Sequence, residues 1–140
     1  MFWILSRTAL AVYSRLPIFG PLSAAVGVIR NGDDFLLIER NDGRGVSFPG
    51  GLVHPWESAE TAVSREILEE TGLRVTKSLL KLRYYSCEEI PVNLIVFEVK
   101  ADGQLRGSWE GTPRWLCLTE FSQRVVPSQK RIVETLCQPR

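Results

Sequence analysis

The sequence predicts a single α/β domain with a mixed β-sheet. Short strand-like runs lie on both sides of one helical segment at 59–71, and a second helical pattern closes the chain at 127–137. Strands that flank a central helix and precede a terminal helix are typical of a sheet covered by helices. The chain has 140 residues, of which 44% are hydrophobic, so it is long enough for one well-packed core.

Residues 1–21 are predicted to form a short helical extension and linker, and the domain itself is expected to cover residues 22–140. The extension contains the most apolar run of the chain, but Arg7 and Arg15 interrupt it, which argues against a secretory signal or a membrane-spanning helix. Two interpretations stay open. An amphipathic helix could pack on the domain or on the partner subunit of a homodimer, or residues 1–20 could contact a membrane surface peripherally.

The strand predictions rest on β-branched and aromatic runs that are bounded by turn residues. The runs at 23–30 and 35–40 are separated by "NGDD", so we expect a hairpin. The glycine-rich segment 41–51 is expected to be a loop with a short extended piece at 46–48. Further strands are expected at 75–87, 92–100 and 114–118, with a turn at Asp102-Gly103.

Charge and cysteine content limit the classes of function. The chain has 17 Lys and Arg against 16 Asp and Glu, and this balance gives no reason to expect a stable nucleic-acid partner. Cys87, Cys117 and Cys137 form neither a CxxC pair nor a cluster with His54, the single histidine. The cysteines therefore favour a reducing, cytoplasmic location and argue against a zinc site, while one histidine makes triad chemistry a poor expectation.

The helical segment carries an unusual excess of negative charge. Ser58 is a good N-cap and Gly72 a good C-terminal stop, which predicts a helix over 59–71. Its glutamates at 66, 69 and 70 share one side of the helix, and Arg65 is the one arginine beside them. Either these carboxylates form a solvated acidic face, or a divalent cation such as Mg²⁺ supplies the missing positive charge.

The wider pattern favours the cation. It consists of Gly51, five residues, Glu57, seven residues and then "REILEETGL", and seven fixed residues at such spacings arise by chance on the order of once in 10⁸ starts. This segment resembles the Nudix box of the Nudix hydrolases, and the preceding "FLLIER" and "SFPGG" are similar to the strand and loop that lead into it. The resemblance covers about 23–118 and implies the α/β/α sandwich of that family.

The resemblance implies a divalent-metal site for Mg²⁺, which Mn²⁺ could replace. Glu69 and Glu70 would bind the metal directly, and Glu66 would be a further ligand or the base that activates water. Glu57 would hold a metal directly or through water, and the carbonyl of Gly50 would be an additional ligand. Arg65 would orient the neighbouring glutamates through its planar guanidinium group.

The implied reaction is hydrolysis of a nucleoside diphosphate linked to a group X, with a (deoxy)nucleoside triphosphate or a modified nucleotide as the expected substrate. The expected catalytic residues are Arg65, Glu66, Glu69 and Glu110, the last because "EGTPRWLCL" resembles the MutT-like branch. Arg40, Phe48 and Gln129 are the candidates for substrate binding, and for Phe48 a place in the core stays open as the alternative. The alternatives are a nucleotide-sugar (ADP-ribose-like) pyrophosphatase and a catalytically silent nucleotide sensor.

The loop before Glu57 departs from the wider family pattern. Where the family commonly has an acidic residue followed two positions later by glycine, this chain has His54 and Trp56. Trp56 is expected to be a partly buried aromatic at a turn, with stiffening of the loop or stacking on a substrate as the alternative. His54 is expected to be an ordinary loop residue. This departure leaves the position of Glu57 open.

Overall fold

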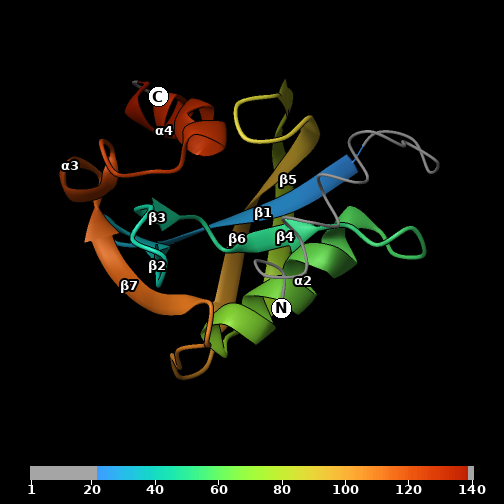
Figure 1. The fold of residues 1–140 in the computed structure, drawn as a ribbon. Coiled ribbons are helices and arrows are strands. Elements are labelled where there is room, and N and C mark those ends of the chain that lie inside the picture. The colour runs from blue at the N-terminus through green and yellow to red at the C-terminus, as the bar shows by residue number, and fades with distance from the viewer. Residues whose placement is uncertain (1–21, 139–140) are drawn as a thin grey trace.

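The computed structural model describes residues 22–138 and confirms a mixed seven-stranded sheet between helices (Figure 1). The predicted N-terminal extension, with its membrane and subunit contacts, lies outside the described residues. Along the chain the elements are β1 (Leu22–Asn31), β2 (Asp34–Arg40), β3 (Val46–Ser47), β4 (Gly50–Leu52), α2 (Ala59–Thr71), β5 (Arg74–Ser86), β6 (Val92–Asp102), β7 (Gly111–Cys117), α3 (Leu118–Phe121), the 3₁₀ helix η1 (Pro127–Gln129) and α4 (Lys130–Cys137).

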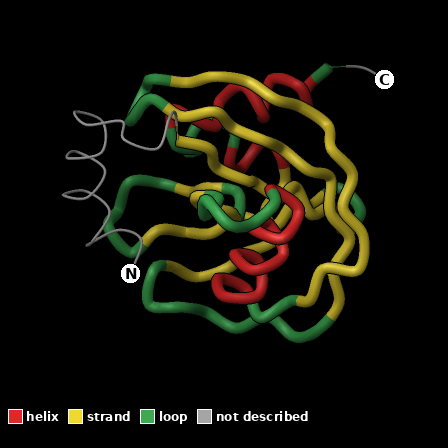
Figure 2. Tube along the Cα trace, turned by 90° about the vertical axis from the view of Figure 1, so that its right-hand side faces the viewer, coloured by secondary structure: helices red, strands yellow, loops and turns green. Residues whose placement is uncertain are grey.

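The sheet opens between β1 and β2. The parallel pair β1 and β6 forms its centre, and β5 pairs antiparallel with β6. β2 pairs with β1 only beside the hairpin turn, at Arg30↔Phe35 and Asn31↔Asp34, and then continues with β3 and β7. Along the first half of β1, strand β4 pairs with β1 in place of β2. β2 and β4 thus pair with different stretches of β1, and the strands together form a curved sheet (Figure 2).

Alternating side chains of the central strands form two cores, one on each face of the sheet. Ile95 and Phe97 of β6 lie in the core that also contains Val63 and Ile67 of α2. Leu94 and Val96 lie in the other core, which contains Ile132 and Val133 of α4. The period of two along a strand thus produces the α/β/α layering, with α4 above and α2 below the sheet in Figure 1.

The predicted hairpin, the helix at 59–71 and the closing helical segment at 127–137 are confirmed, but two elements differ from the expectation. Gly32 has a φ of 62° at the first central position of the two-residue turn, where a type II′ turn requires a positive φ. The segment Gly50–Leu52, expected to begin within a loop, is strand β4, because β1 supplies its hydrogen-bonding partner. Helix α3 was not predicted, since four residues are too few for a helical period to be recognised.

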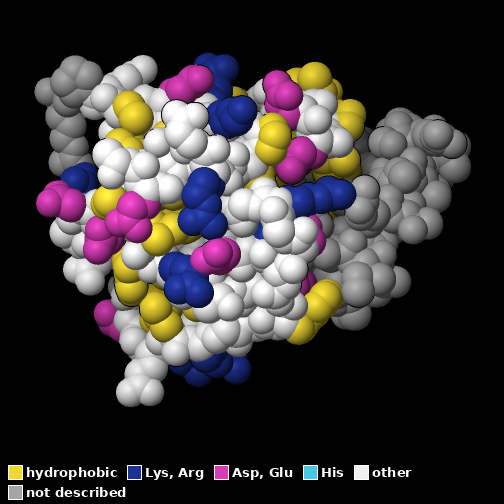
Figure 3. All heavy atoms as spheres, turned by 60° about the vertical axis from the view of Figure 1, so that its left-hand side comes forward, with side chains coloured by type: hydrophobic (Ala, Val, Ile, Leu, Met, Phe, Trp, Pro, Cys, Tyr) yellow, Lys and Arg dark blue, Asp and Glu magenta, His cyan; other side chains and the backbone are white. Residues whose placement is uncertain are grey.

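The surface charges of the described part alternate in sign. Figure 3 shows Lys and Arg side chains interspersed with Asp and Glu side chains over the face that it presents. Arg114 and Arg124, for example, both form ion pairs with Glu39. In the described range 22–138, no helix is long and apolar enough to cross a membrane.

Candidate active site

Helix α2 positions the glutamates because both of its ends are fixed locally. The side-chain oxygen of Ser58 accepts the Thr61 N–H at 3.1 Å, and Gly72 ends the helix in the left-handed conformation with a φ of 80°. Both caps confirm the sequence-based expectation. Between them, Ala62, Val63 and Ile67 pack into the core, so the same face carries the side chains of Glu66 and Glu70 into the protein.

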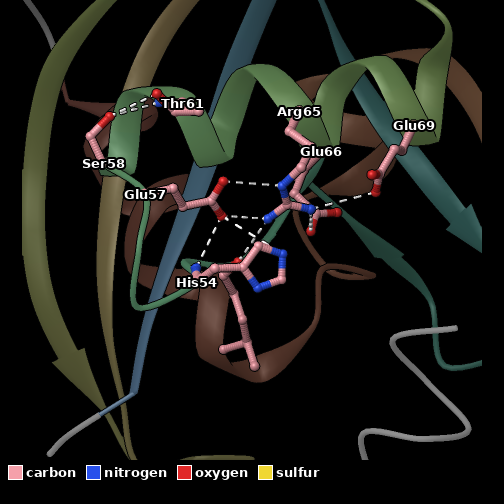
Figure 4. Close-up of polar contacts among 8 residues, drawn as sticks. His54, Glu57, Ser58, Thr61, Arg65, Glu66 and Glu69 are labelled. Carbon is pink, nitrogen blue, oxygen red and sulfur yellow. Dashed lines mark hydrogen bonds and ion pairs between the residues drawn. The ribbon is translucent and has the colours of Figure 1, made fainter. Parts of the chain in front are cut away.

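Arg65 lies at the centre of the acidic cluster (Figure 4). Its Nη1 donates to Glu66 Oε1 at 2.8 Å and lies 3.6 Å from Glu69 Oε2. Its Nη2 donates to the Leu52 carbonyl of β4 at 3.1 Å and to Glu57 Oε1 at 2.7 Å. One guanidinium group thus connects helix α2, strand β4 and the loop before the helix, which supports the orienting role assigned to Arg65.

Glu57 is held tightly by its neighbours. Besides the contact with Nη2, its Oε2 accepts from Arg65 Nε at 3.2 Å, and its Oε1 accepts the His54 backbone N–H at 3.0 Å. The hydrogen bond with Arg65 is the main reason why the pKa of the Glu57 carboxyl lies below its ordinary value, although burial opposes this shift. In this arrangement both carboxylate oxygens of Glu57 position Arg65.

Gly51 allows the Glu66 carboxylate to lie directly against strand β4. A Cβ atom at position 51 would lie 2.5 Å from Cδ of Glu66 and equally close to its Oε1. Any side chain here would therefore have to displace the carboxylate. The fixed glycine of the sequence pattern has a steric explanation in this structure.

Glu66 and Glu70 are both buried and lie one helical turn apart. Burial raises the pKa of Glu66, while the nearby Arg65 opposes that shift. Burial also raises the pKa of Glu70 well above its ordinary value, and the carboxylates of Glu66 and Glu110 raise it further. The raised pKa values mean that the ionised forms of these two carboxyl groups are unfavourable here, and a bound cation would stabilise the ionised forms.

A pocket of about 120 Å³ lies at the opening between β1 and β2. Glu70 and Glu110 line its acidic part and Gly50 also lines it, so the structure brings Glu110 to the residues of the Nudix box. Glu110 reaches this position from the turn immediately before β7, where its backbone N–H donates to Ser108 Oγ at 3.3 Å.

The residues assigned to substrate binding lie in the same pocket but play different structural roles. Gln129 is buried, and its Oε1 accepts the Phe48 backbone N–H at 2.7 Å. The Phe48 ring itself is 2% exposed and packs edge-on against Phe121, so it belongs to the core. Arg40 is buried and pairs with Asp42 at 2.6 Å.

The residues present fit a hard divalent cation. The donors near the pocket are carboxylate and backbone oxygens, which Mg²⁺ prefers, and the buried Glu66 and Glu70 need a counter-charge. Within residues 22–138, no three His, Cys, Asp or Glu side chains form a ready-made ligand group. Arg65 accounts for part of this separation of the carboxylates, because it binds oxygens of both Glu57 and Glu66. Glu69 points outward, with 59% of its side chain exposed.

Immediately before Glu57, the expectation for Trp56 is wrong. Its side chain is 81% exposed and stacks on the His54 ring, with ring centroids 4.9 Å apart. The indole ring therefore lies at the surface and not in either core of the described part. His54 is a loop residue as expected, and it contributes a backbone N–H to Glu57.

Sequence reasoning missed Glu89 and Ser128, two further polar residues that line the pocket. Ser128 Oγ donates to Glu89 Oε2 at 2.7 Å, and the Ser128 carbonyl accepts from Tyr84 Oη at 2.6 Å. Glu89 lies in the segment 87–91 between β5 and β6. No periodicity marks a single glutamate in a connecting segment, so only the acidic pair Glu88-Glu89 beside a predicted strand end could have drawn attention to it.

The comparisons with known proteins agree with the sequence pattern. The profile of the NUDIX domain matches residues 21–136. A Bacillus subtilis (strain 168) protein named "Putative 8-oxo-dGTP diphosphatase YtkD" is 48% identical over 73 residues, which cover 50% of this chain and 45% of that protein. A "MutT-like protein" from Streptomyces ambofaciens is 38% identical over 106 residues, which cover 74% of this chain and 68% of that protein. The chain therefore spans less than half the length of the first of these relatives.

Solved structures share the fold. A MutT NUDIX hydrolase from Burkholderia pseudomallei superposes with a TM-score of 0.73 at 23% identity, covering 84% of this chain and 98% of that one. A MutT protein from Bacillus halodurans gives a TM-score of 0.71 at 24% identity, covering 85% and 84%. The fold, the complete sequence pattern and a domain profile that spans most of the chain all agree, and this chain belongs to the Nudix family.

Proposed function

We propose that the chain is a divalent-metal-dependent pyrophosphohydrolase that acts on a (deoxy)nucleoside triphosphate or a modified nucleotide. Water would attack a phosphorus atom of the substrate, and a phosphoanhydride bond would break. The products of a triphosphate would be the nucleoside monophosphate and pyrophosphate. The observation that carries this proposal is that Glu70, Glu110 and Gln129 line one and the same pocket.

The acidic part of the pocket is suited to the metal. Glu66, Glu69 and Glu70 would hold Mg²⁺, with Gly50 contributing its backbone oxygen and Mn²⁺ as a substitute. When bound, such an ion neutralises phosphate oxygens and lowers the pKa of a water molecule. The role of Glu57 would be to fix Arg65, since both of its oxygens are already hydrogen-bonded.

The chain's own residues would handle the proton and the orientation of the site. Glu66 or Glu110 would accept the proton that the attacking water loses. Arg65 would keep the Glu66 carboxylate in place through its 2.8 Å hydrogen bond, and Gly51 leaves room for that carboxylate. Proton acceptors of this kind contribute about 10²–10⁴-fold to a rate when they are well positioned.

The names of the relatives suggest which substrates to try first. One relative is named for 8-oxo-dGTP and another is called MutT-like, so oxidised and ordinary guanine triphosphates stand at the head of a substrate screen. Nucleotide sugars such as ADP-ribose belong in the same screen. A silent sensor is disfavoured because Arg65, Glu66 and Glu70 are all in place.

The test is a product-resolved assay with Mg²⁺ on the full chain, with the variants Glu70→Gln and Glu60→Gln. Glu70→Gln should lower kcat by at least about a hundredfold, because a group that would bind the metal loses its charge. Glu60 is exposed on the same helix, so its substitution should leave kcat unchanged. Nucleotide binding without any product, even with Mn²⁺, would instead identify a sensor.

A further inference from the structure

We propose that Glu89 selects the nucleobase, favouring a 6-oxopurine such as guanine over a 6-aminopurine such as adenine. The inference rests on the proposed function, because it assigns a specificity role within the same pocket. Glu89 would accept hydrogen bonds from the N–H groups on the edge of the base. Its segment, 87–91, joins β5 to β6 and lies beside the helical turn η1.

The Glu89 carboxylate is fixed at the pocket by contacts to two other elements. Its Oε2 accepts from Ser128 Oγ of η1 at 2.7 Å, and its Oε1 lies 4.0 Å from Nη1 of Arg40 at the end of β2. At 4.0 Å the two atoms are too far apart for a hydrogen bond. The positive charge of Arg40 therefore attracts the Glu89 carboxylate, but Arg40 does not donate a short hydrogen bond to Oε1. An ionised carboxylate accepts about four hydrogen bonds, so it retains capacity to accept further N–H groups.

Gln129 places a donor in the same pocket. Its Oε1 is turned toward the Phe48 backbone N–H at 2.7 Å, and this contact fixes the orientation of the amide. The Nε2 amino group is therefore the part of the side chain that can donate to a ligand. Gln129 directly follows Ser128 in the chain, so the amide and the Glu89 carboxylate are both anchored at η1.

This pair of groups matches one kind of purine edge. A 6-oxopurine carries a carbonyl acceptor next to a ring N–H donor, which suits an amide donor beside an acceptor-only carboxylate. Adenine carries an amino donor next to an unprotonated ring nitrogen. The lone pair of that nitrogen would meet the carboxylate of Glu89, and a buried polar mismatch of this kind is costly.

The size and the lining of the pocket suit a single base. Its volume of about 120 Å³ is below the roughly 300–1,000 Å³ of most ligand sites, so it would enclose only part of a nucleotide, and the part of the pocket lined by Glu89 and Gln129 would take the base. The side chains of Ile90, Val92 and Leu94 contribute apolar walls beside Glu89. Apolar walls with a few polar groups are the usual way in which a site fixes the orientation of a ring.

The test compares kcat/KM for dGTP and dATP in the full chain and in the variants Glu89→Gln and Ser128→Ala. Glu89→Gln keeps an oxygen that can accept from Ser128 but replaces the acceptor-only group. It should reduce the preference for dGTP over dATP at least about tenfold, chiefly through KM for dGTP. Ser128→Ala removes the hydrogen bond that fixes Glu89 but keeps the carboxylate, so the dGTP preference should fall, and a conservative Ser128→Thr variant should restore it.

Each other outcome has a definite meaning. An unchanged dGTP preference in Glu89→Gln would overturn the inference and leave Glu89 with a purely structural role. A wild-type chain that hydrolyses dATP as well as dGTP would also overturn it, while the proposed function would stand. The proposed function fails separately if no nucleotide at all is hydrolysed.

Discussion

The guanidinium group of Arg65 binds the carboxylate of Glu57 through two nitrogens, with Nε at 3.2 Å and Nη2 at 2.7 Å. The pair joins helix α2 to the loop that precedes it, across eight positions of the chain. The same guanidinium also donates to Glu66 and to the Leu52 carbonyl, so this one planar group holds α2, β4 and the preceding loop together. A point charge could not satisfy all of these acceptors.

The substitution Arg65→Lys should therefore be harmful although it conserves the charge. Lysine cannot form the two parallel hydrogen bonds to Glu57 while it also reaches Glu66 and Leu52. We expect a loss of about 1–3 kcal/mol in the free energy of unfolding and a fall in kcat of at least about tenfold. Urea denaturation and the Mg²⁺-dependent assay measure the two effects.

Arg74→Lys serves as the control, because Arg74 is exposed at the start of β5. It should change neither the unfolding free energy nor kcat appreciably. Equal behaviour of the two variants would mean that positive charge alone is required at position 65.

Gly51→Ala should damage catalysis more than it damages folding. The new Cβ would lie 2.5 Å from Cδ of Glu66, so the carboxylate must move away from β4. A displacement of about 1 Å in a reacting group can cost about a hundredfold in rate, which is the loss of kcat that we expect. Gly107→Ala is the matched control, since the nearest atom to its Cβ is 3.6 Å away. Similar kcat values in the two alanine variants would contradict the steric role of Gly51.

Local signals account for the parts of the fold that the sequence predicted well. The bounds 59–71 agree with α2 because Ser58 and Gly72 act on their own helix ends. The hairpin between β1 and β2 was predicted because Gly32 and its neighbours determine the turn. These features depend on contacts within a few residues and can be recognised without a three-dimensional structure.

Features that depend on distant partners could not be predicted in this way. Strand β4 exists because β1 offers hydrogen bonds to Gly50–Leu52, and its glycines carry no strand signal. The meeting of Glu70 with Glu110 results from the path of β7 along β2. The contact between Glu89 and Ser128 joins segments 39 residues apart, which no periodicity encodes.

Glu70→Gln should stabilise the protein when metal is removed with a chelator. Burial raises the pKa of Glu70, so the folded state binds a proton more tightly than the unfolded state does. The wild type therefore loses stability as the pH rises above the unfolded pKa of about 4.3 toward the folded value. We expect the variant to gain at least about 1 kcal/mol over the wild type at pH 8 and little near pH 4.5. Thermal unfolding at both pH values measures this difference.

Metal should reverse that ranking. Excess Mg²⁺ or Mn²⁺ with a non-hydrolysable nucleotide should raise the Tm of the wild type, because a ligand that binds the folded state stabilises it by mass action. Glu70→Gln should show a much smaller increase, whereas the Glu60→Gln control should respond like the wild type. An equal metal response in all three proteins would place the bound cation elsewhere.

Tyr84→Phe should destabilise the protein in a pH-dependent way. The Tyr84 hydroxyl donates to the Ser128 carbonyl at 2.6 Å, and its loss should cost about 1 kcal/mol of unfolding free energy at pH 8. Burial raises the pKa of Tyr84, so the folded phenol stays protonated where the unfolded one begins to ionise, near pH 10. The stability advantage of the wild type over the variant should therefore shrink as the pH rises from 9 to about 10.5.

Urea denaturation across this range checks the trend, with Tyr85→Phe as the control because the Tyr85 side chain is exposed. A pH-independent difference between wild type and Tyr84→Phe would show that the hydroxyl does not titrate differently on folding.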